Sequence, residues 1–171
     1  IRTRLPAGTH FIGHGHRVSF GFLTKDVMTR SIAREQAQLA AADVAAWNQL
    51  GCLSPHVYYV QSGGALSAEK FAEMLAAELE RKENDEPRGE LPAATAANIA
   101  DLRAMYETRA ANICDVRLWQ SEDNTAWTVV YEREREFRPS CLNRFVFVKE
   151  VTDLDEALRT AEMVRGQVST V

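Results

Sequence analysis

An alanine-rich segment between two short β-type segments limits the fold more than any other feature. HRVSFGFL, at about 16–23, and HVYYVQ, at 56–61, are rich in β-branched and aromatic residues, which is typical of strands. Between them, the alanine-rich segment 29–47 contains no Pro or Gly and is dominated by strong helix formers. A strand, a helix and a second strand in this order predict a parallel unit of an α/β fold.

The predicted first helix has clear signals at both ends. Thr29 or Ser31 can cap its start. Its apolar stripe has little bulk, because it consists of alanines with Ile32, Leu39 and Val44. We expect such a helix to lie close to a sheet. Gly51 follows it, where a helix end often needs a positive φ.

The remaining elements complete a mixed sheet. An antiparallel hairpin is predicted for DVRLWQ and AWTVVYERERE around the turn SEDN, and a further strand for NRFVFVKEV. Helical patterns occur in three segments, which are Ser67 to about Glu83, 93–112, and 153–166 with Asp153 as cap. The charged KENDEPRGELP segment predicts an exposed linker, and the alternating charges at 132–136 predict a solvated strand edge. The sequence therefore predicts an α/β fold with a mixed, mostly parallel sheet flanked by helices.

Size, charge and cysteine usage limit the class of protein. A chain of 171 residues is long enough for one domain. The net charge of −4 gives no reason to expect nucleic acid or an anionic membrane as partner. No apolar stretch approaches the roughly 18 residues that span a bilayer, and no signal peptide opens the chain. The three cysteines form neither a disulfide framework nor a C-x-x-C zinc pattern, so we expect a cytoplasmic protein without a metal site.

Cys52 is the strongest candidate for a reactive residue. It follows Gly51 and precedes Pro55, at the junction where the first helix gives way to a strand. A thiol on such a turn can face a cleft, and N–H groups of the turn can lower its pKa and stabilise an oxyanion. Cys114 and Cys141 are expected to be structural, because free cysteines are usually buried.

The histidines allow two interpretations. His14 and His16 in GHGHR are either surface residues of a polar turn or a general acid or base beside the cysteine. Their spacing without a nearby carboxylate is a weak metal signal. His56 begins a strand and is expected to be structural.

Three motifs carry a resemblance to a known family. WNQLGCLSPHVYYV contains Q-x-x-C-L-S-P, and the supporting pieces are R-V-S-F at 17–20 and S-x-L-N-R at 140–144. Together they resemble the LuxC-type acyl-CoA reductases of the aldehyde dehydrogenase superfamily. The resemblance covers essentially the whole chain. It implies an aldehyde-dehydrogenase-like catalytic subdomain with the thiol at its centre.

The resemblance also implies a reaction in two steps. Cys52 attacks the thioester of a fatty acyl-CoA and forms an acyl-cysteine, and NADPH then reduces this group to a fatty aldehyde. The superfamily's hydrolytic members carry a glutamate in an E-L-G-G-K segment. The matching stretch here is GHGHR, which lacks that glutamate and leaves His14 or His16 as proton donors.

The resemblance places most of the cofactor site outside residues 1–171, since the superfamily's nucleotide-binding domain is built mainly from preceding sequence. No dinucleotide fingerprint occurs in the chain. The chain begins at Ile1 without methionine, so we expect it to be the central catalytic part of a longer enzyme. Arg144 is either a contact for the cofactor or CoA phosphates or an ion-pair partner of a carboxylate.

Alternatives to a fatty acyl-CoA reductase follow from the same residues. Related enzymes of the superfamily reduce short acyl-CoAs or acyl phosphates through the same cysteine. A non-catalytic scaffold fragment is the third possibility. We expect the acyl group to come from fatty acyl-CoA or from an acyl-transfer partner enzyme, and a homo-oligomer is possible by analogy with the superfamily.

Overall fold

The computed structural model describes residues 17–171, and the predicted parallel unit opens this part of the chain. It consists of β1 (Val18–Leu23), α1 (Ala33–Ala45) and β2 (Pro55–Gln61), with β1 and β2 paired in parallel. The expectation that small side chains face the sheet is confirmed, since the buried residues of α1 are Ala33, Ala37, Ala40, Ala41, Val44 and Ala45. Ile32 and Leu39 are exposed instead of contributing to this stripe.

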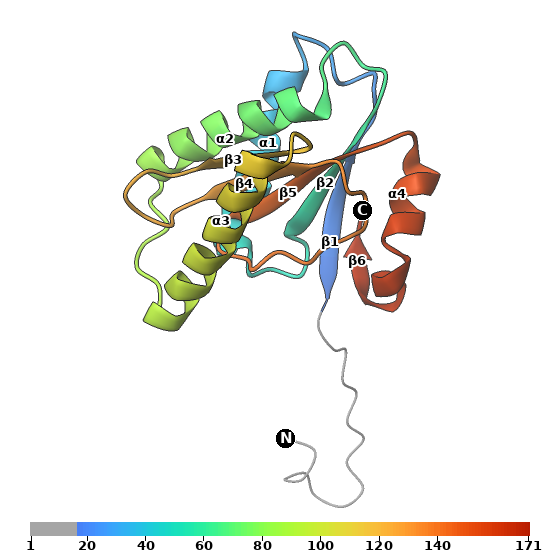
Figure 1. Cartoon of the computed structure of the whole chain (residues 1–171). Helices are drawn as coiled ribbons and strands as arrows, with labels where there is room; N and C mark the ends of the chain where they lie inside the picture. The colour runs from blue at the N-terminus through green and yellow to red at the C-terminus, as the bar shows by residue number, and fades with distance from the viewer. Residues whose placement is uncertain (1–16) are drawn as a thin grey trace, which may run out of the picture.

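All six strands of residues 17–171 belong to one sheet, in the order β3-β4-β5-β2-β1-β6 (Figure 1). β3 (Val116–Gln120) and β4 (Thr128–Glu132) form the predicted antiparallel hairpin, and β4 then pairs in parallel with β5 (Phe145–Val151). A short strand that the sequence did not predict, β6 (Val168–Thr170), pairs in parallel with β1 at the other edge. The predicted fold class, a mixed and mostly parallel α/β sheet, is confirmed.

Helices cover both faces of the sheet (Figure 1). α1 and α2 (Ala68–Asp85) pack on one face, whereas α3 (Ala93–Asn112) and α4 (Leu154–Thr160) pack on the other. The last predicted helix is shorter than expected, because the chain continues as the 3₁₀ segment η3 (Glu162–Gln167) before β6. No helix within residues 17–171 is both long enough and apolar enough to cross a membrane.

Side-chain caps fix the start of two helices. The Ser67 hydroxyl accepts a hydrogen bond from the Lys70 N–H at 3.2 Å at the start of α2. The Asp153 carboxylate accepts one from the Glu156 N–H at 2.8 Å at the start of α4. Each cap satisfies a backbone donor that the helix itself leaves unpaired.

Two predictions about charged segments are confirmed only in part. The segment predicted as an exposed linker is largely exposed, but α2 continues into it as far as Asp85, and Arg88 is half-buried. The alternating charges predicted to lie on a solvated edge are exposed at 133–136, whereas Glu132 is 1% exposed. Its carboxylate accepts a hydrogen bond from the buried Lys149 ammonium at 2.8 Å. β4 is an internal strand, which is why this carboxylate needs a cationic partner.

Candidate functional site

Three segments that lead into parallel strands meet at the N-terminal ends of these strands. Arg17 precedes β1, Cys52 precedes β2 and Leu142 precedes β5. Together with Gln49, Leu50, Gly51 and His56, they line a hollow of about 220 Å³. The topology therefore brings together residues that are far apart in the sequence.

The chain reaches Cys52 through a turn of unusual conformation. After α1, the 3₁₀ segment η2 (Ala46–Gln49) holds Trp47, Asn48 and Gln49 at φ values of 52°, 52° and 64°. The positive φ that the sequence assigned to Gly51 is therefore adopted by three other residues. Few non-glycine residues occupy this left-handed region, so packing must hold the turn in place.

Cys52 itself is exposed, and its backbone is held from one side. The Ser19 hydroxyl donates a hydrogen bond to the Cys52 carbonyl at 2.8 Å. Within residues 17–171, the Cys52 N–H donates to no backbone or side-chain acceptor. An oxyanion donor must likewise have no acceptor within the protein.

Cys52 lies between two hollows of different character. The 220 Å³ hollow contains the polar side chains of Arg17, Gln49 and His56. A second hollow, of about 330 Å³, is more apolar and is lined by Asp43, Ala46, Trp47, Gly51, Cys52, Leu53 and Ser54. Trp47 and Leu53 are exposed at this position. A group attached to the thiol can therefore extend into either hollow.

His56 lies at this site, although the sequence did not assign it there. The expectation of a structural role fits its burial, since it is 3% exposed and its Nδ1 accepts a hydrogen bond from the Ser140 N–H at 3.0 Å. Because that backbone group can only donate, a neutral His56 ring carries its proton on Nε2. The same side chain also lines the hollow of Cys52. Its position four residues after the cysteine was the available sequence signal.

The other two cysteines differ from each other. Cys114 is exposed beyond the end of α3, so the prediction that it fills the core is wrong. The last turn of α3 contributes no buried residue, which leaves the following loop in solvent. Cys141 is half-buried, as expected of a structural cysteine, and burial raises the pKa of its thiol to about 11.

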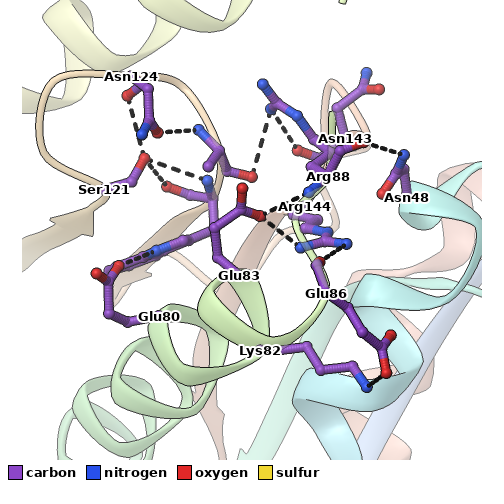
Figure 2. Close-up of polar contacts among 12 residues, drawn as sticks. Asn48, Glu80, Lys82, Glu83, Glu86, Arg88, Ser121, Asn124, Asn143 and Arg144 are labelled. Carbon is purple, nitrogen blue, oxygen red and sulfur yellow. Dashed lines mark hydrogen bonds and ion pairs between the residues drawn. The ribbon is translucent and has the colours of Figure 1, made fainter. Parts of the chain in front are cut away.

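Of the remaining predicted site residues, the structure describes only Arg144. His14 and His16 lie outside the described residues. Arg144 is 4% exposed, and its guanidinium forms an ion pair with Glu83 at 2.7 Å and donates to the Glu86 carbonyl at 3.1 Å (Figure 2). The ion pair that the sequence left as one alternative for Arg144 is therefore present. Its contact with a cofactor stays a prediction.

A larger hollow within residues 17–171 does not contain the thiol. It measures about 510 Å³ and is lined by residues of α4, η3, β1 and β6, with no cysteine or histidine among them. Within residues 17–171, no group of three or more His, Cys, Asp or Glu side chains is arranged to hold a metal ion. We therefore assign the candidate site to the hollow at Cys52 because of its reactive side chains and not because of its volume.

Comparison with known proteins identifies the family and the fold of the chain. A family model described as acyl-CoA reductase (LuxC) matches residues 1–171. No curated protein matches the sequence. Among solved structures, the chain is similar to an NAD-dependent benzaldehyde dehydrogenase from Corynebacterium glutamicum, with a TM-score of 0.57 and 14% identity. That match covers 85% of this chain and 32% of the dehydrogenase, so the two share a fold and the chain spans about a third of that enzyme. The chain belongs to the LuxC acyl-CoA reductase family.

Proposed function

We propose that this chain carries the catalytic thiol of an enzyme that reduces a fatty acyl-CoA to a fatty aldehyde, with Cys52 as the nucleophile. The observation that carries the proposal is the position of Cys52, which is exposed and lies between a polar and an apolar hollow. Family membership supports the reaction class.

In the first step, the Cys52 thiolate attacks the thioester carbonyl of the acyl-CoA. The tetrahedral intermediate places negative charge on the carbonyl oxygen, where the Cys52 N–H can stabilise it. The C–S bond to CoA then breaks, CoA leaves as its thiolate, and the acyl group remains on Cys52. A thiol suits this step because thiolate is a strong nucleophile and the acyl-cysteine stays activated.

The apolar hollow supports a fatty acyl chain as the substrate group. An acyl group on the Cys52 thiol can extend over Trp47 and Leu53, which are 85% and 65% exposed. Covering these side chains removes apolar surface from water, which favours binding. Reduction of a short acyl-CoA or an acyl phosphate remains the second candidate, and it would leave this surface largely uncovered.

The cofactor of the proposed reaction is NADPH, held mainly by residues outside this chain. The solved neighbour is NAD-dependent by its title, which supports a nicotinamide cofactor. When bound, NADPH would supply the hydride that reduces the acyl-cysteine. The 220 Å³ hollow at Cys52 can take a ring-sized group but is smaller than the pockets that hold whole ligands of drug size. Arg144 could contact the cofactor directly only if its ion pair with Glu83 were broken.

After reduction, the hemithioacetal on Cys52 collapses. Its C–S bond breaks, the aldehyde leaves and the thiolate returns. The proton that the overall reaction consumes ends on the CoA thiolate, and the candidates to deliver it are His14, His16 and His56. Of these, His56 lines the hollow of the thiol. Fatty acyl-CoA or an acyl-transfer partner enzyme would deliver the acyl group in the cytoplasm, and a homo-oligomer remains a prediction.

Intact-mass spectrometry after mixing the protein with a long-chain acyl-CoA tests the proposal. We expect the mass of one acyl group to be added to the wild type, to be lost in Cys52→Ala, and to be removed by hydroxylamine. Cys114→Ala is the matched control, because it removes another exposed thiol and should keep the adduct.

The absence of an adduct on the intact protein would exclude the acyl-enzyme mechanism and favour the scaffold. An adduct formed only with short acyl-CoA or acyl phosphate would favour the second candidate.

A further inference from the structure

Two turns of left-handed backbone lie against each other beside Cys52. The first contains residues 47–49, and the second contains Leu142, Asn143 and Arg144 at φ values of 65°, 56° and 66°. None of these six residues is glycine. Such conformations persist only where the surrounding structure fixes them, and they concentrate at functional sites.

Gln49 joins the two turns through its side chain. Its carboxamide is fully buried. The Nε2 group donates a hydrogen bond to the Pro55 carbonyl at 2.7 Å, and Oε1 accepts one from the Phe145 N–H at 3.0 Å. One amide therefore links the two ends of the loop 49–55 to each other and to the start of β5.

Hydrogen bonds from several segments hold the second turn in place. The Asn143 N–H donates to the Asn48 carbonyl at 3.0 Å, and the Asn48 side chain donates to the Arg88 carbonyl at 3.3 Å (Figure 2). The Arg88 guanidinium donates to the carbonyls of Asn143 and Thr125. With the ion pair of Arg144 and Glu83, these contacts attach the second turn to α2 and to the β3–β4 loop.

We propose that Gln49 is the positioning residue of Cys52 and sets the rate at which the thiol is acylated. Gln49 lies three residues before Cys52, and its acceptor Pro55 lies three residues after it. The amide thus holds both ends of the loop, while Ser19 holds its middle. A nucleophile misplaced by about 1 Å can lose about a hundredfold in rate. The inference rests on the proposed function and assigns Gln49 a role that acts through the loop of Cys52.

Two substitutions separate the hydrogen bonds of Gln49 from its volume. Gln49→Met keeps the length and removes both hydrogen bonds. Gln49→Glu keeps the acceptor for the Phe145 N–H, and only its protonated form can donate to the Pro55 carbonyl. Burial favours that protonated form. Gln36→Met, the same change at a half-exposed position of α1, is the matched control.

The three cysteines allow one experiment on the intact protein to report position and folding together. Peptide-resolved mass spectrometry would follow acylation of Cys52 by a long-chain acyl-CoA. It would also follow iodoacetamide labelling of Cys52, Cys114 and Cys141. Cys114 is exposed and serves as the reference thiol, whereas Cys141 is half-buried and reports unfolding.

We expect Gln49→Met to slow acylation of Cys52 by about tenfold to a hundredfold while Cys141 stays protected. For Gln49→Glu, the rate relative to the wild type at the same pH should recover as the pH falls. Gln36→Met should match the wild type.

Acylation of Gln49→Met within twofold of the wild type would overturn the proposal. Labelling of Cys141 as fast as Cys114 in both Gln49 variants would also overturn it, because Gln49 would then hold the fold rather than the loop. If the wild type forms no acyl adduct, the proposed function fails. The labelling ratio of Cys52 to Cys114 then still decides whether Gln49 positions the loop.

Discussion

A buried ion pair shows how a single residue can organise this fold. The Lys149 side chain is fully buried, and its ammonium donates to the Glu132 carboxylate and to the carbonyls of Glu134 and Glu136, each at 2.8 Å. The segment that it holds leads to Ser140, whose N–H donates to His56 in the hollow of the thiol. Lys149 therefore supports the candidate site from within the sheet.

Replacing Lys149 with Met should destabilise the protein by about 3 kcal/mol, because it leaves a buried carboxylate with one fewer cationic partner. Arg109 still pairs with Glu132 at 3.0 Å, which limits the loss. Urea unfolding followed by circular dichroism measures the change. Lys70→Met, which breaks an exposed ion pair with Glu73, should cost less than about 1 kcal/mol. Equal losses for the two variants would contradict this account.

At the scale of elements, the first parallel unit depends on a close approach between β1 and β2. The Tyr58 ring of β2 lies over Gly21 of β1. Its hydroxyl donates a hydrogen bond to the Ala40 carbonyl of α1 at 3.3 Å. A strand residue without a side chain thus makes room for an aromatic ring that ties the helix to the sheet. Gly at such a strand position is typical where another group approaches the backbone closely.

Gly21→Ala should therefore destabilise the fold by about 1–3 kcal/mol, since a Cβ at this position would overlap the Tyr58 ring and overpack the core. Gly63→Ala would not be informative, because φ there is 86° and strain would contribute. Gly166→Ala is the suitable control, as its φ is not in the left-handed range and nothing lies within 4 Å of the added Cβ. Thermal unfolding compares the two, and equal melting temperatures would argue against the close approach.

At the scale of the whole molecule, we propose that the described residues supply one wall of a larger site. The thiol, its loop and two hollows are present, and the chain spans about a third of the dehydrogenase that it resembles in fold. No dinucleotide fingerprint occurs in the sequence. Cofactor affinity should therefore depend on residues beyond those of this chain.

We expect the isolated 171-residue chain to bind NADPH about a hundredfold more weakly than a longer protein that also contains the proposed nucleotide-binding domain, or not to bind it at all. Titration of NADPH fluorescence with each protein gives the two dissociation constants. Cys52→Ala in the isolated chain controls for reaction at the thiol. Equal constants would place the cofactor site within these residues and contradict the proposed division.

The sequence by itself determined the order of most elements and a candidate for the reactive residue. Periodicity and residue type reflect local preference and one-sided burial, so the β-α-β unit, the β3–β4 hairpin and the caps of α2 and α4 could be predicted. Cys52 could be singled out because its neighbours mark a junction between a helix and a strand. The family model that matches the chain is the family that its three motifs indicated.

Only the tertiary structure decided which residues surround the thiol. Arg17 and Leu142 line the hollow of Cys52 because β1, β2 and β5 lie side by side and begin at one edge of the sheet. Glu132 is buried because β4 is internal, although its alternating charges are typical of an exposed edge. Local sequence carries no record of strand order, since that order comes from burial shared between distant segments. For the same reason, packing against residues 142–145 could place the left-handed turn at Trp47–Gln49 rather than at Gly51.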